Sequence, residues 1–166
     1  MNDGKTRIYL DIETDGLSPS DCQLTVVGVY IVRPDGDDFK CFCGEQFDRG
    51  ALLDLVQQAD YIYTYNGHRF DLPFIKARTG LALDRVTRHI DLMYHCWRHN
   101  LRGGLKAVER RLGIVRQLPD IDGYKAVLLW KRYKHYGDQD SFDTLLAYNK
   151  EDCVNLHILR QKLGVD

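Results

Sequence analysis

Apolar and polar residues alternate with a two-residue period in the first third of the chain. This alternation over residues 7–13, and the β-branched and aromatic run over 23–33, predict two β-strands. A Pro-Asp-Gly-Asp turn at 34–37 then leads into a third predicted strand at 39–43. Because the connections are short, the three strands are expected to form an antiparallel meander.

The rest of the chain shows mainly the spacing of three to four residues that is typical of amphipathic helices. A helix is predicted at 47–59, with Asp48 placed to cap it, and a further strand at 61–65. A strand reached through a helix is expected to pair in parallel. Further helices are predicted at 71–79, 92–99, 105–112, 123–136 and 142–163, with a short strand at 88–91. The pattern predicts an α/β fold with a mixed β-sheet flanked by helices.

Composition narrows the class of protein without naming a function. The chain has 166 residues, no repeat and no linker-like tract, so one domain over 1–166 is expected. Its net charge of −1 argues against binding to a polyanion by overall charge alone. The five cysteines lack zinc-finger spacing and are expected to be reduced thiols. No signal region or membrane-length apolar stretch is evident, so a cytoplasmic protein with no membrane partner is expected.

Two acidic residues interrupt the first apolar strand. Asp11 and Glu13 lie two residues apart, so their side chains project from the same face of the strand. Two unpaired carboxylates on one face repel each other, and a divalent metal ion between them would relieve that repulsion. The alternative is an exposed edge strand whose acids are solvated.

Further acidic residues follow near predicted helices. Asp71 lies in the first turn of the helix at 71–79, where it could bind metal or could only cap that helix. Asn66-Gly67, just before it, could be simply a turn. Near the C-terminus, Tyr148 and Asp152 are separated by one helical turn and face the same way, although such a pair is often only a surface hydrogen bond.

Taken together, these residues resemble the DEDD family of 3′→5′ exonucleases. The three motifs of that family match, in order, Asp11-Ile12-Glu13, then Asn66 with Phe70-Asp71, then Tyr148 with Asp152. The third motif has the tyrosine form, because the histidine form would require histidine at Ala147. The segments 105–113 and 130–138 also resemble the YprB-type ribonuclease H-like branch.

The resemblance implies a ribonuclease H-like fold and a two-metal mechanism. It implies that the four carboxylates of Asp11, Glu13, Asp71 and Asp152 hold two Mg²⁺ or Mn²⁺ ions, with Asp11 bridging them. Carboxylate oxygens are suitable ligands for both metals. Tyr148 is expected to orient the attacking water as a protonated phenol. The implied activity is hydrolysis of phosphodiester bonds at the 3′ end of single-stranded DNA or RNA.

Contacts with the nucleic acid are less sharply predicted. The candidates are Asn66, Arg69, Arg102, Lys106 and Lys150. Arg102 and Lys106 belong to a basic stripe that could equally be a solvated helix face offset by Glu109. Three alternative functions stay open: an endonuclease with the same site, a phosphodiesterase for short oligonucleotides, and a nucleic-acid-binding or scaffold module with little catalysis.

Overall fold

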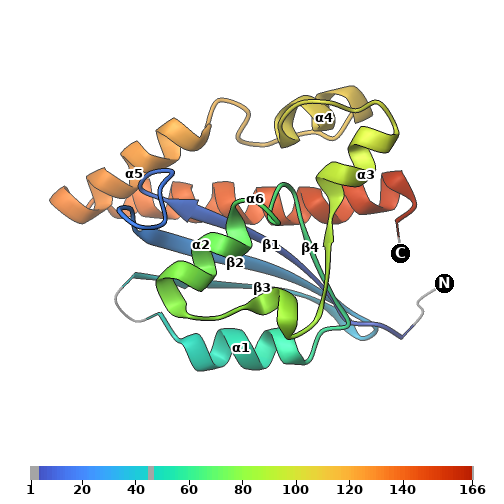
Figure 1. Cartoon of the computed structure of the whole chain (residues 1–166). Coiled ribbons are helices and arrows are strands. Elements are labelled where there is room, and N and C mark those ends of the chain that lie inside the picture. The colour runs from blue at the N-terminus through green and yellow to red at the C-terminus, as the bar shows by residue number, and fades with distance from the viewer. Residues whose placement is uncertain (1–3, 45–46, 166) are drawn as a thin grey trace.

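The computed structural model describes residues 4–44 and 47–165, and its centre is one mixed β-sheet. The strands are β1 (Arg7–Thr14), β2 (Leu24–Arg33), β3 (Gly36–Cys43), β4 (Tyr61–Thr64) and β5 (Arg88–Asp91), in the order β3-β2-β1-β4-β5 (Figure 1). The pairs β1–β2 and β2–β3 are antiparallel, whereas β1–β4 and β4–β5 are parallel. The predicted meander and the predicted parallel extension are both confirmed.

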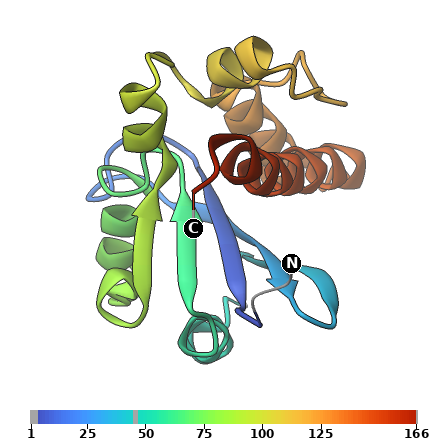
Figure 2. The same ribbon diagram turned by 90° about the vertical axis from the view of Figure 1, so that its right-hand side faces the viewer.

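Helices cover both faces of this sheet (Figures 1 and 2). They are α1 (Arg49–Gln57), α2 (Asp71–Thr79), α3 (Leu92–Arg98), α4 (Leu105–Leu112), α5 (Gly123–Tyr136) and α6 (Gln139–Leu163), with a 3₁₀ turn η2 (Leu83–Arg85). The prediction started the last helix too late, because the Asp138 side chain caps α6 by accepting a hydrogen bond from the Ser141 N–H. Within the described residues, no helix is both long and apolar enough to span a membrane.

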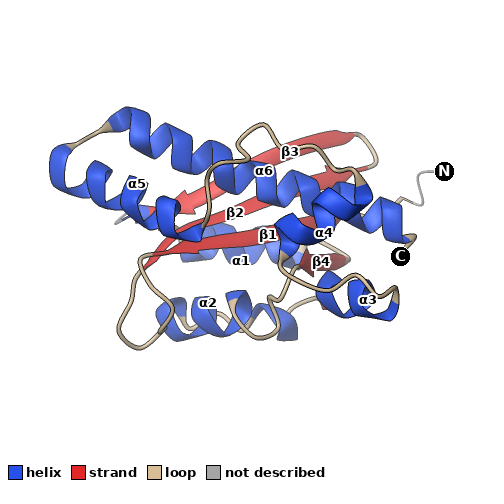
Figure 3. Ribbon diagram, turned by 90° about the horizontal axis from the view of Figure 1, so that it is seen from above, coloured by secondary structure: helices blue, strands red, loops and turns tan. Residues whose placement is uncertain are grey.

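The alternation along β1 sends its side chains into two different cores. Ile8, Leu10 and Ile12 pack with α1 and α2 on one face of the sheet. Tyr9 projects from the other face, where its ring stacks on Tyr63 at 5.1 Å and packs with α3, α4 and α6. Asp11 and Glu13 therefore share the face of Tyr9. Figure 3 shows α6 lying across the sheet, seen from above.

A glycine in β2 lets α6 lie close to this face. Gly28 pairs with Asp11 across the β1–β2 ladder. A Cβ atom at Gly28 would lie 1.8 Å from Oδ1 of Asn149 on α6, so no larger residue fits without movement. The missing side chain brings α6 near the acidic residues of β1.

The loop after β4 is fixed by a buried acid. Asn66 has a φ of 62°, a left-handed conformation that asparagine tolerates better than most residues. The Asp91 carboxylate accepts hydrogen bonds from the backbone N–H groups of Asn66 at 2.8 Å, His68 at 3.0 Å and Met93 at 3.1 Å. Asp91 thus caps α3 and also holds the turn that leads to Asp71.

Candidate active and metal-binding site

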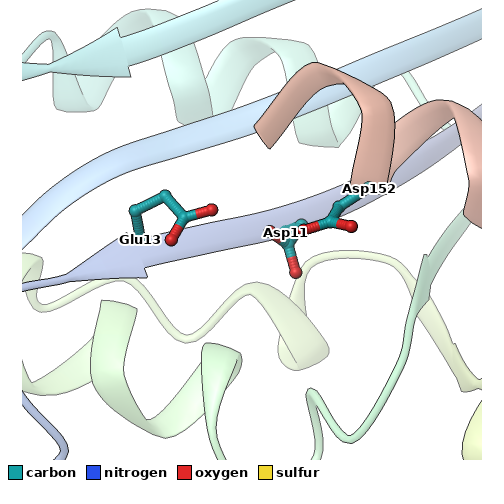
Figure 4. A group of neighbouring side chains, drawn as sticks. All are labelled: Asp11, Glu13 and Asp152. Atoms are coloured by element: carbon teal, nitrogen blue, oxygen red, sulfur yellow. The ribbon is translucent and has the colours of Figure 1, made fainter. Parts of the chain in front are cut away.

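Three of the predicted carboxylates converge between β1 and α6. Asp11, Glu13 and Asp152 each place one carboxylate oxygen within 4.8 Å of the others (Figure 4). Two come from alternate positions of β1 and the third from the face of α6 that lies over the sheet. Residues that are 139 positions apart in sequence, from Glu13 to Asp152, thus form one compact anionic group.

Burial and mutual repulsion make ionisation of this group unfavourable. Burial raises the pKa of Asp11 well above its ordinary value, and the charges of Asp152, Glu13 and Asp71 raise it further. Burial and the Asp152 charge act in the same direction on the pKa of Glu13. For Asp152, burial raises the pKa to about 6 although the Arg116 guanidinium opposes the shift. A bound divalent cation would favour the ionised form of all three.

Asp71 lies next to this group but outside the set of three. It is the first residue of α2 and is buried, and its side chain does not cap the helix because Phe70 occupies the N-cap position. Burial raises the pKa of Asp71 to about 7, while hydrogen bonds from the backbone of Asp71 itself and of Ile12 act against the shift. The bond from Ile12 places this carboxyl group beside β1. Its charge also contributes to the raised pKa of Asp11 and Glu13.

Two further residues of α6 surround the carboxylates. Asn149 is fully buried, and its Nδ2 donates to the backbone oxygen and to Oδ2 of Asp11, both at 3.1 Å. The sequence motif contains Asn149, yet the prediction gave it no role. The Tyr148 ring lies near two cations, with Lys106 Nζ 5.1 Å and Arg116 Cζ 5.5 Å from its centre. Burial, and then the charge of Asp152, raise the pKa of the Tyr148 phenol, so it stays protonated.

Arg116 is the largest omission of the sequence prediction. Its Nη2 donates to Asp152 Oδ1 at 2.5 Å, and its Nη1 donates to both carboxylate oxygens of Glu109 at 2.7–2.8 Å. Glu109, which one of the two open readings of the basic stripe placed on a solvated helix face, is fully buried and also accepts a hydrogen bond from Asn155 at 3.0 Å. A third acid, Glu151, lies 3.6 Å from Arg116 Nε. Arg116 therefore supplies the positive charge next to Asp152.

Two adjoining cavities open over the carboxylates. The larger, about 450 Å³, is lined by the three acids together with apolar side chains that include Leu17, Phe70 and Tyr124. The second, about 300 Å³, shares Asp11, Tyr148 and Asp152 with it and extends along Tyr65 to Lys106. The acids thus line an open site whose larger cavity has an apolar wall and whose second cavity carries Lys106 together with a further acid, Asp122.

The five residues predicted to contact the substrate lie in different parts of the structure. Lys106 lines the second cavity, whereas Asn66 forms the turn after β4. Arg69 and Arg102 both lie on the exposed surface around Trp97, with Arg102 in the loop before α4 and not on the predicted helix. Lys150 lines neither cavity: its Nζ lies 5.6 Å from the centre of the Phe39 ring on β3. It follows Tyr148 by two residues, about 200° around the helix, so it points away from the site.

The fold and the acidic group identify the class of protein. Residues 8–164 match the model of the RNase H superfamily, and the chain belongs to that family. This is a nuclease superfamily whose ribonuclease H-like members use divalent metals. The mixed five-stranded sheet with helices on both faces agrees with its fold.

Among individual proteins, the chain is 32% identical over 104 residues to the uncharacterised protein YprB of Bacillus subtilis, covering 57% of this chain and 25% of YprB. The family B DNA polymerase of Pyrobaculum calidifontis has a TM-score of 0.73 at 21% identity, covering 96% of this chain and 24% of the polymerase. Brucella melitensis NrnC, solved with pGG, has a TM-score of 0.64 at 21% identity, covering 95% of this chain and 71% of NrnC. The chain therefore spans only about a quarter of YprB and of the polymerase.

Proposed function

We propose that this chain is a metal-dependent 3′→5′ exonuclease of the tyrosine form of the DEDD family, acting on single-stranded DNA or RNA. The observation that carries the proposal is the convergence of Asp11, Glu13 and Asp152 within 4.8 Å at the base of an open cavity. The structure of NrnC with pGG supports a nucleic-acid substrate for this fold.

The residues present suit a hard divalent cation. All the converging ligand atoms are carboxylate oxygens, which Mg²⁺ and Mn²⁺ prefer, and the nearby cation Arg116 bonds only to Asp152 among the three acids. Asp11, Glu13 and Asp152 would hold the metal, with Asp71 beside them as a fourth ligand. When bound, a divalent ion supplies Lewis-acid activation of water and neutralises charge on the phosphate. NrnC has also been solved with bound Mg²⁺.

Tyr148 and Lys106 would act on the reacting groups from the cavity wall. Because the Tyr148 phenol stays protonated, it can donate a hydrogen bond and orient the attacking water, but it cannot serve as the base. Lys106 lines the cavity over Asp11 and Asp152, where its ammonium group can bind a phosphate oxygen. The acids alone would repel a phosphodiester, so this cation also favours substrate entry.

The apolar wall suits the bases at the end of a strand. Leu17 and Tyr124 are 85% and 72% exposed, and both line the larger cavity with Phe70. Unstacked bases bind to such side chains by stacking and apolar contact, largely without regard to sequence. Bases of a paired duplex would first have to separate, so this wall supports a single-stranded substrate.

A time course with end-labelled strands tests the proposal directly. Single-stranded DNA and RNA labelled at the 5′ end are incubated with Mg²⁺, with Mn²⁺ or with a chelator. A ladder that shortens stepwise from the 3′ end, only when metal is present, is the expected result. Internal cuts would indicate an endonuclease instead of an exonuclease. Hydrolysis of short oligonucleotides alone would indicate a phosphodiesterase. If no metal-dependent product formed, the proposed activity would be refuted in favour of a nucleic-acid-binding module.

Variants connect the activity to the site. Asp11→Asn and Asp152→Asn should each abolish hydrolysis while the circular dichroism spectrum stays unchanged. Asp54→Asn on α1 removes the same charge from an exposed position away from both cavities, and should keep full activity. Full activity of Asp11→Asn or Asp152→Asn would contradict the proposed active site.

A further inference from the structure

An uncompensated basic segment lies beside the proposed cleavage site. Residues 92–108 contain Arg98, Arg102 and Lys106, two histidines and no acid, although the whole chain has a net charge of −1. This stretch forms α3, the following loop and the first turn of α4. Positive charge gathered on one segment of a nearly neutral chain is the electrostatic pattern expected for a polyanion-binding surface.

Arg102 of this segment and Arg69, from the turn before α2, both lie against the indole ring of Trp97, and these three residues form the Trp97 surface. The guanidinium carbons of Arg69 and Arg102 lie 5.7 Å and 5.3 Å from the centre of the Trp97 ring. Tyr94 packs against the same indole edge to face at 5.4 Å. In residues 4–44 and 47–165, neither arginine makes an ion pair with a carboxylate. Their planar donors are thus positioned, exposed and available to an anion.

This surface continues directly into the second cavity. The Tyr65 hydroxyl donates to the backbone oxygen of Gly103 at 2.6 Å, and Gly103 follows Arg102. Tyr65 and Gly104 line that cavity with Asp11 and Lys106. The wall of this cavity therefore leads from the acids to the loop that carries Arg102.

We propose that Arg69 and Arg102, held on Trp97, bind two backbone phosphates of a nucleic-acid strand just outside the cleavage cavity. This proposal rests on the proposed function, because it extends the same substrate beyond the reacting phosphate. Guanidinium groups bind phosphate oxygens through two parallel N–H donors, and such contacts depend on charge but not on base identity. The surface would therefore hold the strand without selecting a sequence.

Salt dependence of strand binding tests this surface independently of catalysis. Binding of fluorescein-labelled single strands is measured by anisotropy on an Asp11→Asn background, which prevents cleavage. Loss of two phosphate contacts in Arg69→Gln/Arg102→Gln should lower the slope of log K against log salt concentration by about 1.4. Arg85→Gln/Lys131→Gln removes the same charge from exposed positions on η2 and α5, and should leave the slope unchanged.

Trp97 itself offers a direct optical readout. The chain has two tryptophans, and Trp130 is buried in another cluster, so Trp130→Phe leaves Trp97 as the only indole. Its fluorescence should change when a long strand binds and stay constant with a dinucleotide that fills only the cavity. An unchanged salt slope in the arginine variant together with constant Trp97 fluorescence would overturn the proposal. A protein that binds strands by this surface but never cleaves them would refute the proposed function alone.

Discussion

Replacing Asp71 by asparagine is expected to stabilise the metal-free protein at neutral pH. Burial raises the pKa of this carboxyl group from its ordinary 3.8 to about 7 in the folded chain. Between these two values the folded state binds a proton that the unfolded state has lost. The contribution of Asp71 to stability therefore falls as pH rises from about 4 to about 7. Asparagine has a similar shape and no proton to release in this pH range. No charge forms in the buried position, so the variant avoids this cost.

The size of the effect follows from the pKa shift. From about pH 5 to about pH 8, the folded state releases the Asp71 proton while the unfolded state has already released it. This difference corresponds to about 3 kcal/mol of lost stability. The stability advantage of Asp71→Asn over the natural sequence should grow by that amount across the interval, a large fraction of the 5–15 kcal/mol typical of a domain.

Urea unfolding in a chelator, at several pH values, measures this advantage. Three half-buried histidines contribute a slope of opposite sign, because partial burial lowers the pKa of His89, His95 and His157 and the unfolded chain protonates them first as the pH falls. Both proteins contain these histidines, so the difference in stability between the proteins cancels their contribution and reports Asp71 together with its effect on Asp11 and Glu13. Asp54→Asn, at an exposed position, should show no such trend.

Adding Mg²⁺ supplies the second half of the test. If Asp71 is a metal ligand, the metal should stabilise the natural protein more than Asp71→Asn, and the advantage of the variant should shrink or reverse. A stability difference that stays constant with pH in the chelator would refute the reasoning about burial. A metal response equal in both proteins would remove Asp71 from the ligand set.

Three further substitutions examine the surroundings of the acids. Arg116→Gln leaves Glu109 and Asp152 without their guanidinium, and urea unfolding should show a loss of stability of about 3–5 kcal/mol. Adding Glu109→Gln should recover part of this loss, and a double variant whose effects simply add would contradict the coupling. Gly28→Ala should lower stability by about 1–3 kcal/mol because its Cβ overlaps the Asn149 amide, and an unchanged melting temperature would contradict the close approach. Tyr148→Phe should slow hydrolysis at least about tenfold while calorimetry shows Mg²⁺ binding retained; an unchanged rate would argue against the water-orienting role.

Local periodicity was enough to predict the parts of the site that lie within one element. A spacing of two on a strand placed Asp11 and Glu13 on one face, and a spacing of four on a helix did the same for Tyr148 and Asp152. Periodicity alone could not show that the two faces meet. The resemblance to a known family supplied that expectation, and the structure brings the three acids together.

Features that depend on contacts between elements escaped prediction. Asn149 lies between the predicted residues Tyr148 and Asp152, but its importance depends on the missing side chain of Gly28 on β2. Lys150 was selected because it lies within the same motif in sequence, yet helix geometry turns it away toward Phe39. Closeness in sequence was therefore a poor guide to closeness in space on a helix.

The arrangement of charges explains why an arginine outside the motifs matters to the carboxylates within them. Arg116 pairs with Asp152 and Glu109, so the acid on α6 has a cation even without metal. Asp11 on β1 accepts a hydrogen bond from the neutral amide of Asn149, and burial together with the charges of Asp152 and Glu13 raises its pKa. In the part of the chain that the structure describes, Arg116 pairs with Asp152 and with neither acid of β1, so the strand acids have less compensation from neighbouring cations. Arg116 thus reduces the repulsion on the helix side of the group, and under the proposed function a divalent ion would do the same for the acids of the strand.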